Sequence, residues 1–199
     1  MNKKTYSSAI KKTPYKYYIS KTIAKLILKG YDRNEVFFEC FTNNAVQIDS
    51  LERRREVTNV VYERLLNLDR YLLEEFVNGD VSTSKFILVY AIAKTDHLFF
   101  DFLYEFYREA LLGVKKYISI DDFDLFFKSK KEIDSTVKSW GDYTIDQLGK
   151  GYRNILVESS FGRREKKNIY VVKPVVHPDV IEYLKKINET PYLKALLGE

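Results

Sequence analysis

Apolar residues recur three and four positions apart along most of the chain, which is the spacing of one face of an α-helix. Ile19, Ile23 and Ile27 predict a helix over residues 17–29, and Gly30 is a natural stop for it. Glycine and proline are scarce, at eight and four in 199 residues, which leaves few positions for tight turns. The pattern therefore predicts a mainly α protein, built as an all-α helical bundle.

Two further helices follow the first after short turns. Asp32 is placed to cap a helix over residues 32–42, with Glu35 three positions later as its capping-box partner. Ser50 opens the next helix. The succession of helix, short turn and helix makes residues 17–42 a first candidate helix-turn-helix.

The most apolar stretches are residues 82–95 and 98–112, which predict two helices that are apolar almost all round. Helices of this kind lie inside a protein, so we expect both to form the central core. Asp101 and Glu105 interrupt the second stretch, and we expect no segment to cross a membrane.

A second succession of helix, turn and helix lies nearer the C-terminus. The pattern predicts amphipathic helices over residues 119–130 and 131–139 and a turn that ends at Tyr143. Thr144 is then placed to cap a helix over residues 144–159.

Two features distinguish this last helix. Gly149 and Gly151 lie inside it, and since an interior glycine costs about 1 kcal/mol relative to alanine, we expect a local start or kink. Behind it, the basic turn of residues 161–168 and the β-branched run 169–172 predict a small winged-helix-like β-hairpin.

These elements suggest two lobes. We expect an N-terminal helical lobe over residues 1–114, which holds the first helix-turn-helix. A C-terminal helical lobe over residues 115–199 would hold the second, winged-helix-like element.

The net charge of +5 conceals a strong segregation of charge. Residues 1–33 carry nine basic residues against one acidic residue, a net charge of +8, and residues 146–173 carry seven against three, or +4. Residues 34–145 carry fourteen against twenty, or −6. Two basic segments that flank an acidic middle favour a polyanionic partner, with a purely solubilising surface charge as the alternative.

Residue types that bind metals or act as nucleophiles are few. His97 and His177 are the only histidines and Cys40 is the only cysteine, so no Cys/His metal site can be assembled. A single cysteine within an apolar run is typical of a buried thiol in a reducing compartment, and we therefore expect a cytoplasmic protein.

The remaining candidates for catalysis are acidic. Asp121, Asp122 and Asp124 cluster at an expected helix start, where carboxylates favour the positive end of the helix dipole. A metal-dependent nuclease using them is a rival that we disfavour, and the sequence has neither a GxGxxG nor a GxxxxGK[ST] motif. We expect no enzyme activity, no cofactor and no small-molecule substrate.

The basic and polar residues around the two helix-turn-helix candidates are those that we expect to contact a polyanion. In such a motif the second helix enters the major groove of DNA, and nearby Lys and Arg side chains hold the phosphates. Within the second candidate, the helix residues would face bases and the hairpin residues would lie on the backbone. The expected contact residues are Lys11, Lys12, Lys16, Lys21, Arg53, Arg54, Arg55, Thr144, Gln147, Lys150, Arg153, Arg163, Arg164, Lys166 and Lys167.

Three pieces of the chain, taken in order, resemble a known family. They are residues 19–30, the helix with Arg53, Arg54, Val57, Val60, Val61, Arg64 and Leu65, and the run Trp140-x-x-x-Thr144-x-x-x-Leu148 followed by Ile155 and Leu156. In order and spacing they are similar to the BrxA family of BREX (bacteriophage exclusion) anti-phage defence systems. Members of the family often have other residues at two positions, where this chain has Gly141 and Gln147. These two departures lie next to and within the helix that is expected to contact bases.

The resemblance implies helix-turn-helix elements flanked by basic patches and binding to double-stranded DNA without catalysis. Other BREX subunits would be further partners. A similarity to the antitermination factor NusB, a helical RNA-binding protein, comes with it. An RNA-binding module of the NusB type and a protein-interaction scaffold within the BREX complex are therefore the alternatives to DNA binding.

Overall fold

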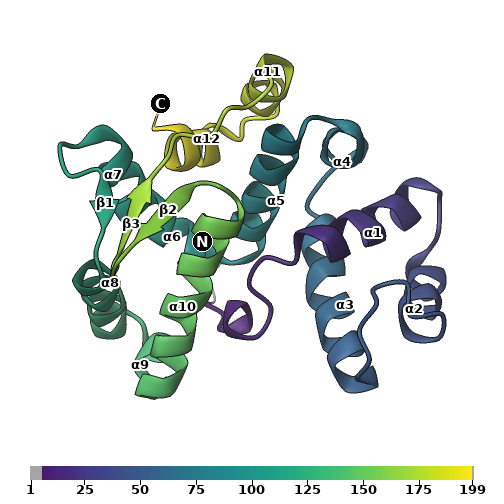
Figure 1. The fold of residues 1–199 in the computed structure, drawn as a ribbon, viewed down its shortest axis with the longest axis horizontal. Coiled ribbons are helices and arrows are strands. Elements are labelled where there is room, and N and C mark those ends of the chain that lie inside the picture. The colour runs from purple at the N-terminus through teal and green to yellow at the C-terminus, as the bar shows by residue number, and fades with distance from the viewer. Residues whose placement is uncertain (1–5, 199) are drawn as a thin grey trace. The chain divides into compact units, whose positions relative to one another are not determined.

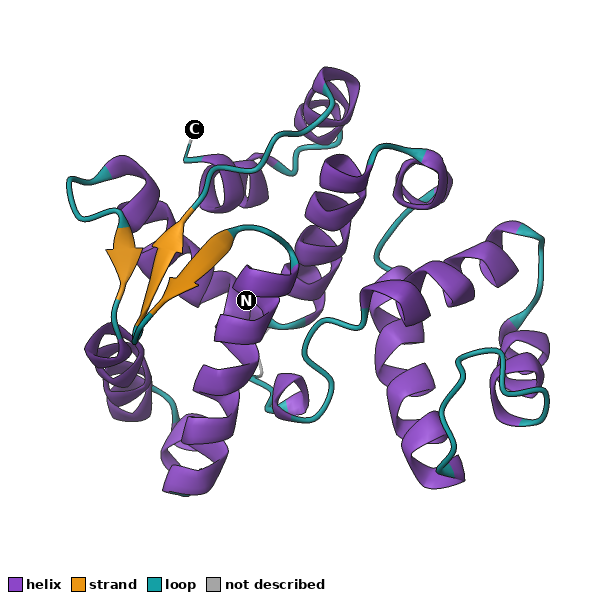
Figure 2. Ribbon diagram, in the orientation of Figure 1, coloured by secondary structure: helices purple, strands orange, loops and turns teal. Residues whose placement is uncertain are grey.

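A computed structural model describes residues 6–198, of which most are helical. Helix accounts for 68% of the chain, and a small antiparallel sheet completes the described structure (Figure 2), so the predicted mainly α class is confirmed. The chain divides into two units that we describe separately. Residues 16–95 form the helical unit, and residues 6–15 together with 96–198 form the sheet unit.

The helical unit is built around α5. Its helices, in chain order, are α1 (Tyr17–Leu28), α2 (Arg33–Phe41), α3 (Leu51–Leu65), α4 (Arg70–Asn78) and α5 (Val81–Thr95). Every residue of α5 from Phe86 to Ala93 is buried, and α1, α3 and α4 all pack against this helix. The predicted helix starts are confirmed, because Asp32 and Glu35 form a reciprocal capping box and the Ser50 hydroxyl accepts from the Arg53 amide at 3.3 Å.

The sheet unit combines a short N-terminal segment with the second half of the chain. Its helical elements are η1 (Ala9–Lys11), α6 (His97–Phe102), the π-helical η2 (Leu103–Tyr107), α7 (Arg108–Leu112), α8 (Ile120–Ile133), α9 (Ser135–Lys138), α10 (Asp142–Glu158), α11 (Pro178–Lys186) and α12 (Thr190–Leu197). Its strands are β1 (Tyr117–Ile118), β2 (Gly162–Glu165) and β3 (Asn168–Val171). They pair antiparallel in the order β1-β3-β2, which leaves β3 in the middle.

The boundary that the sequence suggested, after Val114, falls inside the sheet unit. Aromatic packing explains this, because the Phe102 ring lies 4.9 Å from that of Phe123 in α8 and 5.2 Å from that of Tyr152 in α10. Residues 97–112 therefore belong with the C-terminal elements. The two apolar helices expected to share one core instead each lie in the core of a different unit.

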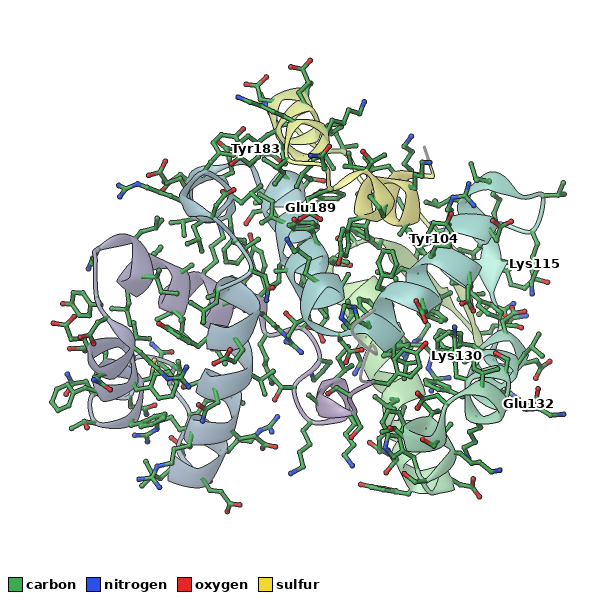
Figure 3. The ribbon with its side chains drawn as sticks, turned by 180° about the vertical axis from the view of Figure 1, so that it is seen from behind. Tyr104, Lys115, Lys130, Glu132, Tyr183 and Glu189 are labelled. Carbon is green, nitrogen blue, oxygen red and sulfur yellow. The ribbon has the colours of Figure 1, made fainter. Side chains whose placement is uncertain are left out.

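A buried lysine links three segments of the sheet unit. Lys130 of α8 is labelled in Figure 3. Its side chain is only 6% exposed, and its Nζ lies 2.6 Å from a Glu105 oxygen. The same Nζ lies 3.2 Å from an Asp101 oxygen, which also accepts a hydrogen bond from the Tyr6 hydroxyl at 2.6 Å. The cluster holds η2, α8 and the N-terminal segment together.

Helix α10 differs from its prediction in two respects. It begins at Asp142, because Gly141 is extended and its carbonyl accepts from the Thr144 amide, so Thr144 lies in the first turn instead of capping it. The helix is also unbroken at its glycines. A methyl group on Gly151 would lie 2.8 Å from Ile10 Cγ2, so this glycine allows η1 to pack closely against α10.

The other local differences are small. Helix α8 extends to Ile133, and Asp134 then caps the short α9 by accepting from the Val137 amide at 2.9 Å. The β2–β3 hairpin is confirmed, but strand β1 was not predicted. It has two residues, and only its pairing with β3 makes it a strand.

Candidate nucleic-acid interface

The elements β1, α8, α9, α10, β2 and β3 follow one another along the chain and gather in one part of the sheet unit, where α10 lies beside the hairpin (Figure 1). One side of α10 is fixed in the core through Leu148, Tyr152 and Ile155, all fully buried. The opposite side is exposed. The position of this helix is thus set by apolar packing, while its polar side chains are left for other contacts.

The exposed side of α10 carries an acidic residue that the sequence analysis missed. The Asp146 carboxylate lies 2.7 Å from Lys150 Nζ and accepts from Gln147 Nε2 at 3.1 Å. The hydrogen bond from Lys150 lowers the pKa of Asp146 below its ordinary value, so the carboxylate is charged at neutral pH. Two predicted contact residues, Gln147 and Lys150, therefore contact Asp146. The sequence could have indicated this, because Gln147 follows Asp146 directly and Lys150 lies four positions after it, on the same side of a helix.

A second residue missed by the sequence analysis is Tyr143. It lies in the first turn of α10, and it is 75% exposed. The expected turn ended at this tyrosine, so it was not considered as a helix residue.

The basic leader and α10 meet in the structure. Lys11 of η1 donates from Nζ to the Thr144 hydroxyl at 3.5 Å, and Lys12 next to it is exposed. Ile10 is fully buried against α10. Lys11 and Thr144 are 133 positions apart in the sequence, yet they lie together at the start of α10.

The hairpin carries its charges on both faces and at its tip. Lys166 and Lys167 form the turn, and Lys166 has a left-handed φ of 53°. Side chains alternate along β2, so Arg163 and Glu165 share one face, where they form an ion pair.

Arg164 lies on the other face of β2, together with Gly162. A methyl group on Gly162 would lie 3.6 Å from Leu156 Cβ, which shows that this face is directed toward α10. Arg164 also pairs in register with Ile169, a residue that is 1% exposed. Arg163 and Arg164 are therefore consecutive in sequence but opposite in direction.

Arg153 of α10 occupies a distinct position among the predicted contact residues. Its guanidinium lies over the Phe123 ring, 5.5 Å from the centroid, and its buried Nε has no hydrogen-bond acceptor among the described residues. Burial lowers the pKa of Arg153, and the nearby positive charge of Arg164 lowers it further. The charge of Arg164 is therefore near enough to act on that of Arg153.

In the helical unit, several predicted contact residues serve the fold. The Arg54 guanidinium donates hydrogen bonds to three backbone carbonyls that precede α3. These carbonyls belong to Phe41, Ile48 and Asp49. Arg54 therefore stabilises the segment that connects α2 and α3.

The other predicted residues of this unit have varied surroundings. Lys21 donates to the Val77 carbonyl at 3.1 Å, and Arg53 forms an ion pair with Glu56 at 2.6 Å. Arg55 is exposed and lies over the Phe41 ring, 5.8 Å from its centroid. Lys16 immediately precedes α1 with a left-handed φ of 60°. Lys21, Arg53 and Arg54 thus have partners within the unit, whereas Arg55 is exposed.

The acidic cluster near α8 has a structural explanation. The Asp122 carboxylate accepts from the Ser119 amide at 2.7 Å and pairs with Lys115, completing a capping box. Among the described residues, no group of three or more His, Cys, Asp or Glu side chains is arranged to hold a metal ion. Within residues 6–198, no helix is both long and apolar enough to span a membrane.

Two comparisons with known proteins identify the same family, and a third concerns the fold. The BrxA family model matches residues 4–188. The BREX protein BrxA of Bacillus cereus (strain H3081.97) is 33% identical to this chain over 199 residues, which is 100% of both chains. The crystal structure of an uncharacterized protein from Magnetospirillum magneticum matches 98% of this chain and 99% of that chain with a TM-score of 0.85, at 21% identity. The last likeness concerns the fold alone, whereas the first two cover nearly the whole sequence, and the chain therefore belongs to the BrxA family.

Proposed function

We propose that this protein binds double-stranded DNA through the sheet unit and catalyses no reaction. The observation that carries the proposal is the order β1, α8, α9, α10, β2 and β3 with β3 central in the sheet, and this order and pairing support a winged helix-turn-helix. In this reading α8 and α10 are the helix pair, α10 enters the major groove, and the β2–β3 hairpin is the wing.

The charges near these elements support a DNA backbone as the partner. Residues 146–173, which hold most of α10 and the whole hairpin, carry a net charge of +4. Lys11 adds a further positive charge at the start of α10. Phosphate contacts of this kind supply most of the affinity in sequence-independent binding.

The biological setting follows from the family. A full-length relative is a BREX protein, so we propose that this protein is an accessory or regulatory component of a BREX anti-phage system, with other BREX subunits as partners. We place it in the cytoplasm, where the buried thiol of Cys40 stays reduced. The helix-turn-helix of α1 and α2 has weaker support as a DNA contact, since Arg54 and Lys21 are committed to carbonyls.

The proposal is tested by fluorescence anisotropy with a labelled duplex at several salt concentrations. Two variant pairs remove charge near the interface, Lys11→Gln with Lys12→Gln, and Lys166→Gln with Lys167→Gln. A control pair, Lys186→Gln with Lys194→Gln, removes the same charge from exposed positions of α11 and α12. Each phosphate contact removed lowers the slope of log affinity against log salt by about 0.9.

We expect both interface pairs to weaken binding and to lower the slope, and the control pair to do so less. Equal effects of all three pairs would mean that affinity follows net charge alone and not this surface. Tighter binding to single-stranded RNA than to the duplex would support the RNA-binding alternative instead. No binding to either nucleic acid by folded protein would favour the protein scaffold.

A further inference from the structure

Arg153 of α10 and Arg164 of β2 share a lack of hydrogen-bond acceptors among the described residues, although they belong to different elements of the sheet unit. Arg55 of α3 also lacks one but lies over the Phe41 ring in the helical unit, whereas Arg33 pairs with Glu63 at 2.8 Å and Arg70 pairs with Glu74 at 2.8 Å. No described residue accepts a hydrogen bond from Arg153 or Arg164, and no described carboxylate lies within ion-pair distance of either. Each guanidinium offers five N–H donors, so a large unmet demand for acceptors is concentrated at this point.

The fold directs these two like charges toward the surface where α10 and β2 pack together. Arg153 projects from α10, and its guanidinium lies over the Phe123 ring of α8. Arg164 is directed to the same side by the alternation of β2, since Gly162 on that face lies against Leu156. The positive charge of Arg164 disfavours that of Arg153, and an anion that lies between the two guanidinium groups would relieve this repulsion.

The carboxylates in the neighbourhood do not fill this role. Asp146 forms an ion pair with Lys150 at 2.7 Å. Asp146 and Asp124 both raise the pKa of Arg153 through their charges, but neither forms an ion pair with it. The nearest acidic residue of the hairpin, Glu165, pairs with Arg163 on the opposite face.

We propose that Arg153 and Arg164 form a clamp for one tetrahedral oxyanion, with a phosphate of the DNA backbone as its ligand. The choice of DNA as the source of the phosphate rests on the function proposed above. Planar guanidinium groups bind phosphate oxygens through paired N–H donors. The contact with the Phe123 ring orients the Arg153 guanidinium before the ligand binds. The clamp assigns Arg153 to the backbone, although the sequence analysis expected it to read bases.

The clamp is tested with three single variants and one double variant. Arg153→Ala and Arg164→Ala each remove one half of it, and the double variant removes both. Arg163→Ala is the matched control, because it removes the same charge from the adjacent residue on the other face. Far-ultraviolet circular dichroism confirms that each variant is folded.

We expect Arg153→Ala and Arg164→Ala each to weaken duplex binding by about tenfold, equivalent to about 1.4 kcal/mol. Arg163→Ala should have a clearly smaller effect. Because both arginines hold one phosphate, the double variant should lose less than the product of the two single effects. Arg153→Lys keeps the charge but loses the planar fork, so it should not restore the affinity.

Inorganic sulfate gives a readout that does not depend on DNA. At matched ionic strength, sulfate should raise the melting temperature of the wild type above its value in chloride, and this difference should shrink in Arg153→Ala and Arg164→Ala. If the wild type binds duplex DNA but Arg164→Ala behaves like Arg163→Ala in both assays, the clamp is wrong and the DNA-binding proposal stands. If sulfate acts through both arginines but duplex DNA does not bind, the oxyanion site stands and the proposed function fails.

Discussion

The two glycines inside α10 provide a matched test of how the N-terminal segment packs. Gly151 approaches η1 closely, since a methyl group there would lie 2.8 Å from Ile10 Cγ2 and 3.1 Å from the Ile10 carbonyl oxygen. A methyl group on Gly149 would meet only Phe127 Cε2 at 3.8 Å, an ordinary contact distance. The two positions belong to the same helix and differ in what surrounds them.

The expected effects follow from two opposing contributions. Replacing an interior helix glycine by alanine stabilises a helix by about 0.8–1.0 kcal/mol. At Gly149 nothing opposes this gain, so Gly149→Ala should raise the free energy of unfolding by about 0.5–1 kcal/mol. At Gly151 the added methyl group presses on backbone, and overpacking of this kind costs about 1–3 kcal/mol. Gly151→Ala should therefore be destabilising by up to about 2 kcal/mol.

Urea unfolding followed by tryptophan fluorescence measures both variants directly. Trp140 is the single tryptophan and lies just before the first residue of α10, so its emission reports on this helix. A change of 1 kcal/mol shifts the melting temperature of a protein of this size by about 2–4 °C. The glycine variants should therefore melt several degrees apart, in opposite directions from the wild type. Equal stabilisation by both would refute the docking of η1 on α10.

Two further perturbations test other parts of the sheet unit. Lys130→Met should destabilise by about 2–4 kcal/mol, because it leaves two carboxylates without their shared cation, although Glu105 is 41% exposed and can be hydrated. Lys131→Met is the control, and it should change the free energy of unfolding by less than about 0.5 kcal/mol because Asp142, the partner of Lys131, is fully exposed. Similar melting temperatures for the two lysine variants would contradict the role of the Lys130 cluster. Burial raises the pKa of Asp122, but hydrogen bonds from Lys115 and Ser119 outweigh this effect, so the pKa lies below its ordinary value of 3.8. The resulting stabilisation is fully present above pH 3.8 and is lost as pH falls through the lower folded-state pKa of Asp122. The free energy of unfolding of Asp122→Asn should therefore fall less steeply than that of the wild type over that acidic range. Parallel curves of stability against pH for the two proteins would count against this role.

Local chemistry made much of the fold predictable from the sequence. Helix starts depend on neighbouring residues, so the cap at Ser50 and the capping box of Asp32 and Glu35 could be recognised directly. The hairpin was predictable for the same reason, since β-branched residues follow a basic turn. Strand β1 could not be predicted, because two residues form a strand only when a distant partner is available.

The division into units and the surroundings of each cation depended on contacts between distant residues. Residues 97–112 join the C-terminal elements because of the rings of Phe123 and Tyr152, which no local pattern around Val114 could indicate. The need for a glycine at position 151 of α10 likewise depends on Ile10, more than a hundred positions away.

Charge shows the same distinction most clearly. The sequence by itself determined that positive residues gather near both ends of an acidic middle, and its family follows from residue order over the whole chain. It could not determine which of these residues keep unmatched donors, because consecutive residues point about 100° apart on a helix and to opposite faces on a strand. Arg54 fastens a loop while Arg55 is exposed, and Arg163 pairs with Glu165 while Arg164 faces α10. Only the tertiary structure, which determines what lies opposite each face, directs Arg153 and Arg164 toward the surface shared by α10 and β2.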